Sequence, residues 1–154
     1  MSVSEAVRVR ALVCQEVGPT KAREKLGANS TGLPFNSLSA IERSADGRTN
    51  PMVNAGAIAT TSLVQGTTGA ERWRFIQHGL SRFAGRTLSL NEEVYASASE
   101  TNFRNRSIAN LLQSYDRIYC DPAEATGPLH AAVFAQCERQ RSCSDGRNAC
   151  RRRC

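Results

Sequence analysis

The stretch from Thr49 to Leu63 constrains the fold most, because it contains no Lys, Arg, Asp or Glu. It opens with the turn signal Asn50-Pro51 and continues with small, mostly uncharged residues. A helix on a protein surface carries a charged face, which this stretch lacks. The sequence therefore predicts a buried, closely packed helix from Val53 to about Gln65.

Asn54 is the polar exception within this segment. A buried carboxamide without a hydrogen-bond partner costs about 1–3 kcal/mol, so its side chain must be satisfied. Two interpretations follow from the residues alone. The side chain either holds a turn together at the start of the helix or faces a bound ligand.

Apolar periodicity and turn signals predict further helices on both sides of this segment. The strongest pattern places Trp73, Leu80 and Phe83 on one side of a helix that ends near Gly85. A later helix has Thr101 as its predicted cap and Phe103 on its apolar side. The predicted helices cover Val3–Val17, Pro19–Leu26, a short element within Ser37–Ile41, Ala70–Phe83, Asn102–Gln113 and a start at Asp121-Pro122.

The composition is that of an ordinary globular domain. With 154 residues, of which 40% are hydrophobic, the chain fits one domain that can bury a core. It contains no apolar run long enough to cross a membrane, and Met1–Arg10 lacks the apolar region of a signal peptide. We therefore expect a cytoplasmic protein without a membrane partner.

The last residues, 129–154, differ from the rest. Six arginines and two acidic residues there carry four of the six net positive charges, and four of the six cysteines lie there too. No Cys-x-x-Cys pair occurs, so we expect free thiols and no metal site. Glu138–Cys154 has almost nothing apolar besides cysteine and is expected to be disordered. The tail lacks the interleaved aromatic residues typical of nucleic-acid binding, so no nucleic-acid partner is expected.

Several motifs occur in the same order as in one known family. The residues Asn50-Pro51-Met52-Val53-Asn54-Ala55-Gly56-Ala57 resemble the signature of the serine-dependent glutaminases, which share the β-lactamase and penicillin-binding-protein fold. Collinear matches cover about Val17–Ala125. The other matching motifs are Gly32-Leu33-Pro34-Phe35-Asn36-Ser37, Glu71-Arg72-Trp73, Asn91-Glu92-Glu93-Val94, Thr101-Asn102-Phe103-Arg104-Asn105-Arg106-Ser107-Ile108-Ala109 and Tyr119-Cys120-Asp121.

The resemblance implies a fold and a function. Residues 1–128 would form a partial glutaminase domain, the mainly α, helical portion of a β-lactamase/transpeptidase-like α/β fold with most of the sheet missing. The family hydrolyses L-glutamine to L-glutamate and ammonia through a serine acyl-enzyme. It uses no metal and no cofactor. L-glutamine is thus the expected ligand, and a homo-oligomer is one arrangement open to the chain.

The family's Ser-x-x-Lys motif puts a nucleophilic serine and its lysine base on one face of a helix. An alignment with one inserted residue places this motif at Ser2 and Glu5, whereas an ungapped one places it at Val3 and Ala6. We prefer Ser2, because Ser2-Val3-Ser4 matches the start of the motif. In either alignment the lysine is missing, so impaired hydrolysis is expected.

The resemblance also implies substrate-binding residues. Asn54 and Asn105 match positions at which the family holds the polar groups of the substrate. For Asn105 the alternative is a solvated or capping residue between two arginines. Ala98 stands where the family has a glutamate, and Leu129 where it has a tyrosine.

The ends that depart from the family can be explained by translation in a shifted reading frame. Synonymous codons for Glu5–Arg10, Leu129–Phe134 and Asp145–Cys154 can be chosen that encode family-like sequence one base later. The sequence of the tail would then result from the shifted frame and not from a binding function.

Two alternatives to an active glutaminase stay open. The first is a catalytically inactive fragment that associates with intact glutaminase subunits, and the less favoured one is a basic nucleic-acid-binding protein.

Overall fold

The computed structural model describes residues 3–90, 93, 95–96, 100 and 102–127, with side chains from residue 7 onward. The proposed nucleophile Ser2, the substituted position Ala98, the predicted cap Thr101 and the tail 129–154 lie outside the described residues.

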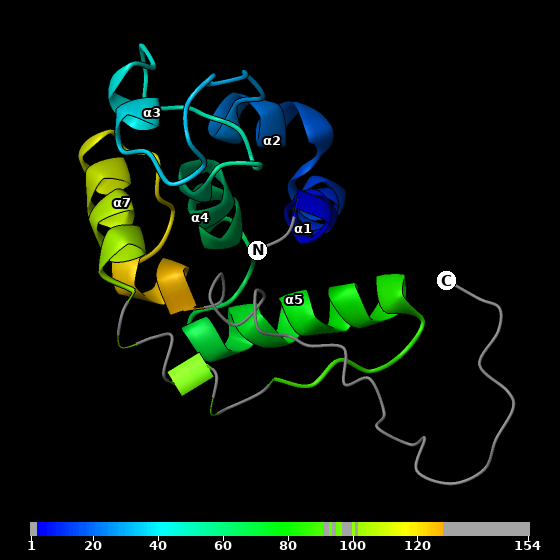
Figure 1. The fold of residues 1–154 in the computed structure, drawn as a ribbon. Coiled ribbons are helices and arrows are strands. Elements are labelled where there is room, and N and C mark those ends of the chain that lie inside the picture. The colour runs from blue at the N-terminus through cyan, green and yellow to red at the C-terminus, as the bar shows by residue number, and fades with distance from the viewer. Residues whose placement is uncertain (1–2, 91–92, 94, 97–99, 101, 128–154) are drawn as a thin grey trace, which may run out of the picture.

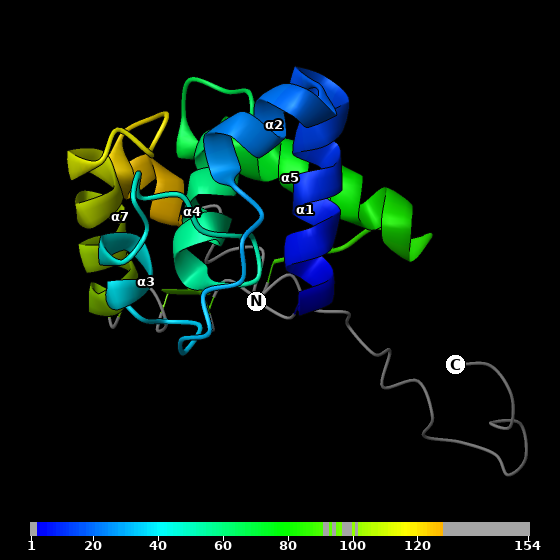
Figure 2. The same ribbon diagram turned by 90° about the horizontal axis from the view of Figure 1, so that it is seen from above.

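The described residues form helices joined by loops, with no strand among them. The charge-free helix α4 lies at the centre, with α7 on one side and α1 and α2 on the other (Figure 1). Helix α5 crosses the end of this group and packs against α1 (Figure 2). The helices are α1 (Val3–Val17), α2 (Pro19–Leu26), α3 (Ser39–Glu42), α4 (Asn54–Ser62), α5 (Gly69–Ala84) and α7 (Phe103–Ser114), and residues 122–127 are also helical.

Helix α4 is buried on all sides, as its composition predicts. Every residue from Ala55 to Ser62 is buried. Its three hydroxyl side chains avoid the cost of unpaired polar groups by bonding carbonyl oxygens of their own helix. Thr60 donates to Gly56 O at 2.6 Å, and Ser62 donates to Ala59 O at 2.7 Å. Thr61 lies within reach of two carbonyls, Ile58 O at 2.9 Å and Ala125 O at 3.1 Å.

The predicted helix ends are confirmed at several places. Pro19 begins α2, and Gly27 follows it with φ 69°. The hydroxyl of Thr68 accepts a hydrogen bond from Glu71 N at the start of α5, and Gly85 ends that helix in the left-handed conformation. Asp121 caps the helical residues 122–127, because its Oδ1 accepts from Ala123 N at 2.9 Å.

Two aromatic residues predicted to be on apolar helix faces are exposed instead. Phe83 is 48% exposed because the last turn of α5 extends past the helices that cover the rest of it (Figure 2). Phe103 is 67% exposed because it begins α7, whose buried contacts come from the following turns through Ile108, Ala109 and Leu112. Both residues lie in the predicted helices, but the covered part of each helix does not extend to them.

Gly56 determines how closely the turn before α4 can approach this helix. A Cβ atom at this position would lie 2.0 Å from Asn50 O and 3.0 Å from Asn50 N. Both atoms belong to the backbone, so they can give way only if the turn moves. Glycine is therefore required for the close approach of residues 50–53 to α4.

We expect Gly56→Ala to destabilise the protein by about 2–4 kcal/mol, although alanine is the better helix former by about 1 kcal/mol. The physical cause is the clash with Asn50. Urea denaturation followed by circular dichroism measures the change. Gly32→Ala is the matched control, because a Cβ atom at position 32 has no neighbour within 4 Å. The expected destabilisation is only the strain of alanine at the positive φ of 61°, about 1 kcal/mol. Equal losses in the two variants would contradict the steric explanation.

Candidate functional site

The two asparagines singled out by the sequence meet at the start of the central helix. Asn54 is the first residue of α4, and Asn105 lies in the first turn of α7. Asn54 Nδ2 donates a hydrogen bond to Asn105 Oδ1 at 2.8 Å. Both side chains are half-buried. Although the residues lie 51 positions apart in the sequence, the packing of α4 against α7 brings them together (Figure 1).

The loop before α4 is attached to both helices beside this pair. Asn54 N donates to Phe35 O at 2.7 Å, and Arg104 Nε donates to Asn36 O at 3.0 Å. Phe35 and Asn36 belong to one of the motifs that resemble the glutaminases. Thus three separate matching motifs converge at one place, which the sequence could not show.

The asparagine pair keeps hydrogen-bonding capacity for a ligand. One amide hydrogen of Asn54 is used by Asn105, while Asn54 Oδ1 and Asn105 Nδ2 have no partner among the described residues. A carboxamide oxygen accepts and a carboxamide nitrogen donates, so together the two side chains present one acceptor and one donor. This combination can hold another amide, or an amino group and a carboxylate.

Asn50 stabilises the turn rather than facing a ligand. Its Oδ1 accepts from Met52 N at 2.9 Å, and its Nδ2 donates to Asn29 O at 2.6 Å. Both ends of the carboxamide are therefore engaged by the backbone. The result is a fixed connection between the loop at residues 28–33 and the turn at residues 50–53.

A groove of about 610 Å³ lies between that loop and that turn. Its size is within the range of small-molecule sites, about 300–1,000 Å³. Val53, the residue directly before Asn54, forms part of its wall, as do Ser30, Met52 and Arg10 of α1. No local sequence pattern marked Arg10 as a groove residue.

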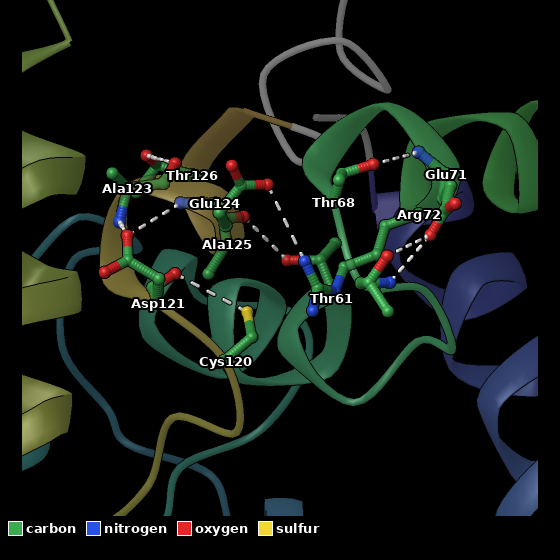
Figure 3. A network of polar contacts seen from close by, with 11 residues as sticks. Thr61, Thr68, Glu71, Arg72, Cys120, Asp121, Ala123, Glu124, Ala125 and Thr126 are labelled. Atoms are coloured by element: carbon green, nitrogen blue, oxygen red, sulfur yellow. Dashed lines mark hydrogen bonds and ion pairs between the residues drawn. The ribbon is translucent and has the colours of Figure 1, made fainter.

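A second polar cluster joins α5 to the residues that follow α7 (Figure 3). Arg72 is only 7% exposed, and its guanidinium Nη1 lies 3.7 Å from Glu124 Oε2. This is an ion pair longer than a hydrogen bond, and both atoms lack a hydrogen-bond partner. Two matching motifs, residues 71–73 and 119–121, are thereby brought to the same cluster. No local sequence signal marked Arg72 as buried.

Cys120 belongs to this cluster but does not have the properties of a nucleophile. Burial raises the pKa of its thiol, and the nearby positive charge of Arg72 only partly opposes this effect. At neutral pH the group is therefore a thiol, whereas a cysteine nucleophile must be a thiolate. Its sulfur contacts Asp121 O at 3.5 Å. The cluster is best explained as a connection between segments.

The remaining predicted site residues are placed as follows. Glu5 lies in the first turn of α1, but its side chain and all of Ser2 are outside the described residues.

Where the structure is described, no three His, Cys, Asp or Glu side chains come close enough to hold a metal ion. Each helix in the described ranges is too short or too polar to cross a membrane.

The hydrogen bond between Asn54 and Asn105 can be measured by a double-mutant cycle. We expect Asn54→Ala and Asn105→Ala to destabilise the protein individually, with a coupling energy of about 0.5–1.5 kcal/mol, because either change removes the same bond. Urea denaturation of the wild type, both single variants and the double variant measures the coupling. Additive effects would show that the contact does not form in solution.

Comparison with known proteins places these features in a family. The family model for glutaminases matches residues 1–149. Glutaminase 2 of Yersinia pestis is 69% identical over 126 residues, which make up 82% of this chain and 37% of that protein. A glutaminase of Brucella canis is 53% identical over 115 residues, or 75% of this chain and 36% of that protein.

Solved structures show the same likeness in the fold. A probable glutaminase, YbaS, is 42% identical with a TM-score of 0.82, and the match covers 86% of this chain and 43% of that one. A probable glutaminase of Bacillus subtilis is 26% identical with a TM-score of 0.82, covering 87% of this chain and 43% of that one. The described helices thus correspond to the helical portion of a larger fold, and the chain spans little more than a third of the curated relatives it matches. On this evidence the chain belongs to the glutaminase family.

Proposed function

We propose that this chain carries the amide-binding part of a glutaminase site, and that the reaction served by this site is the hydrolysis of L-glutamine to L-glutamate and ammonia. The observation that carries the proposal is the contact between Asn54 and Asn105, which leaves an acceptor oxygen and a donor nitrogen without a partner among the described residues. A glutamine molecule offers matching groups in its amide, amino and carboxylate ends.

A related structure supports the choice of ligand. A protein named Mglu, 29% identical to this chain with a TM-score of 0.76, has been solved in its L-glutamate binding form. Relatives with higher identity carry the name glutaminase. These proteins are longer than the present chain, so the activity of the whole enzyme is part of the proposal for this one.

In the proposed reaction, Ser2 Oγ attacks the side-chain amide carbon of glutamine. A base takes the hydroxyl proton of Ser2 and passes it to the leaving nitrogen as the C–N bond breaks, so that ammonia departs and a glutamyl ester of Ser2 remains. Water then attacks the ester, which releases glutamate and restores the serine hydroxyl. The Asn54–Asn105 pair acts before these steps by orienting the substrate, which lowers the entropic cost of reaching the reactive geometry.

The step that this chain performs poorly is activation of the nucleophile. Glu5 stands where the family motif has a lysine. An ordinary glutamate carboxylate is a weak base at neutral pH, because its pKa lies far below the operating pH. General-base catalysis contributes about 10²–10⁴ to rate, so the proposal includes slow turnover by the chain as it stands.

Restoring the lysine tests this proposal. We expect Glu5→Lys to increase ammonia release from L-glutamine by at least about tenfold, since it supplies the missing base. Glu5→Gln is the matched control, because it removes the carboxylate without adding an amine. Adding Ser2→Ala to Glu5→Lys should abolish the gain.

Substrate binding is measured in parallel by calorimetric titration with L-glutamate. Asn54→Ala should weaken this binding by about tenfold, as expected for one lost hydrogen bond to a charged or polar ligand. The proposal is overturned if L-glutamate does not bind, or if ammonia release persists in the Ser2→Ala variant.

A further inference from the structure

We infer that Arg104 is a positioning residue for the asparagine pair, which holds the first turn of α7 where Asn105 meets Asn54. The consequence for ligand binding rests on the proposed function. The positioning itself follows from the hydrogen bonds that surround the pair.

A tight turn at residues 34–37 contacts the starts of both helices. Ser37 N donates to Pro34 O at 3.0 Å, and this bond closes the turn with Phe35 and Asn36 at its centre. The turn itself does not use the carbonyl groups of its two central residues, so these groups can accept hydrogen bonds from other segments.

Helix α4 uses the first of these carbonyl groups to cap its N-terminus. The first backbone N–H groups of a helix have no partner within the helix, and the flanking residue Val53 has no side-chain oxygen that could accept from them. Asn54 N donates instead to Phe35 O at 2.7 Å. This cap fixes the turn relative to the residue that begins α4.

Arg104 binds the second carbonyl group and completes a ring of contacts. Its Nε donates to Asn36 O at 3.0 Å, and the next residue in the chain is Asn105. Asn105 Oδ1 accepts from Asn54 Nδ2 at 2.8 Å, and the backbone of Asn54 is bonded to the turn. The ring therefore begins and ends at Asn54, and Arg104 is its connection between the turn and α7.

The first turn of α7 needs this connection, because packing fixes the helix mainly beyond that turn. Asn102, the N-cap residue, makes no side-chain cap hydrogen bond, and Arg104 itself is exposed. Helix ends without such support fray. The buried residues of α7 all lie in later turns: Ile108, Ala109 and Leu112.

Arg117 provides a matched control away from the pair. Its Nε donates to Asp46 O at 2.7 Å, so it also connects a loop to the region of α7 through a backbone carbonyl group. Its Nη2 lies 3.6 Å from Asp46 Oδ2, which adds an ion pair. Loss of Arg117 should therefore destabilise the fold at least as much as loss of Arg104 does.

The first experiment repeats the double-mutant cycle of Asn54→Ala and Asn105→Ala in the Arg104→Met background, by urea denaturation. In the wild type we expect the two alanine substitutions to be coupled by a factor of about two to ten in the folding equilibrium constant. In Arg104→Met this factor should fall to about one, because the carboxamides are no longer held together. In Arg117→Met it should equal the wild-type factor.

The second experiment is calorimetric titration of the full chain with L-glutamate. We expect Arg104→Met to weaken binding by about three- to tenfold, because the ligand must then pay for ordering the pair, and Arg117→Met to leave it unchanged. Adding Arg104→Met to Asn105→Ala should cause no further loss, since Arg104 acts through Asn105. A residue that contacted the ligand itself would weaken binding in both backgrounds.

The outcomes separate this inference from the proposed function. The inference is overturned if the wild type shows no coupling, if coupling persists in Arg104→Met, or if Arg117→Met abolishes it as well. It is also overturned if Arg104→Met weakens L-glutamate binding further in Asn105→Ala. If coupling follows the expected pattern but the wild type does not bind L-glutamate, Arg104 still positions the pair and the proposed function falls.

Discussion

The packing of the structure depends on the burial of helix α4, which contains no charged residue. α4 is surrounded by α1, α2 and α7, and its small residues let these elements approach closely. The same feature fixes the site, because the turn at residues 50–53 can lie against the helix only where Gly56 has no side chain. Asn54 is thus presented at a defined place by packing and not by a flexible loop.

The polar groups within this core serve as connections between segments. Ser62 Oγ accepts a hydrogen bond from Tyr119 N at 3.1 Å, and Tyr119 Oη donates to Lys25 O at 3.0 Å. Arg72 and Glu124 connect α5 to the same region through a long ion pair (Figure 3). The Arg72 side chain is buried, whereas that of Glu124 is 43% exposed, so desolvation of Arg72 and solvent screening of Glu124 offset the Coulomb attraction and the pair contributes little net stability. Its effect is to specify how the segment after α7 lies against α5.

Much of the fold could be predicted from the sequence. The bounds of α1 and α2 agree with the predicted ranges Val3–Val17 and Pro19–Leu26, because the glycine and proline residues at these helix ends act through local backbone geometry. The exposure of Phe83 and Phe103 was not predicted, since periodicity shows which residues share a helix face but not where the covering helices end. The places of Arg10 and Arg72 depend on contacts with distant segments, which no local pattern contains.

We propose that α4 and α7 together hold a polar ligand through Asn54 and Asn105, each of which lies in the first turn of its helix. Heteronuclear NMR of the side-chain amide groups, recorded while L-glutamate is added, tests this claim most directly. We expect the amide resonances of both Asn54 and Asn105 to shift together and to saturate at one ligand concentration. Saturable shifts confined to other residues, with both asparagine signals unchanged, would contradict it.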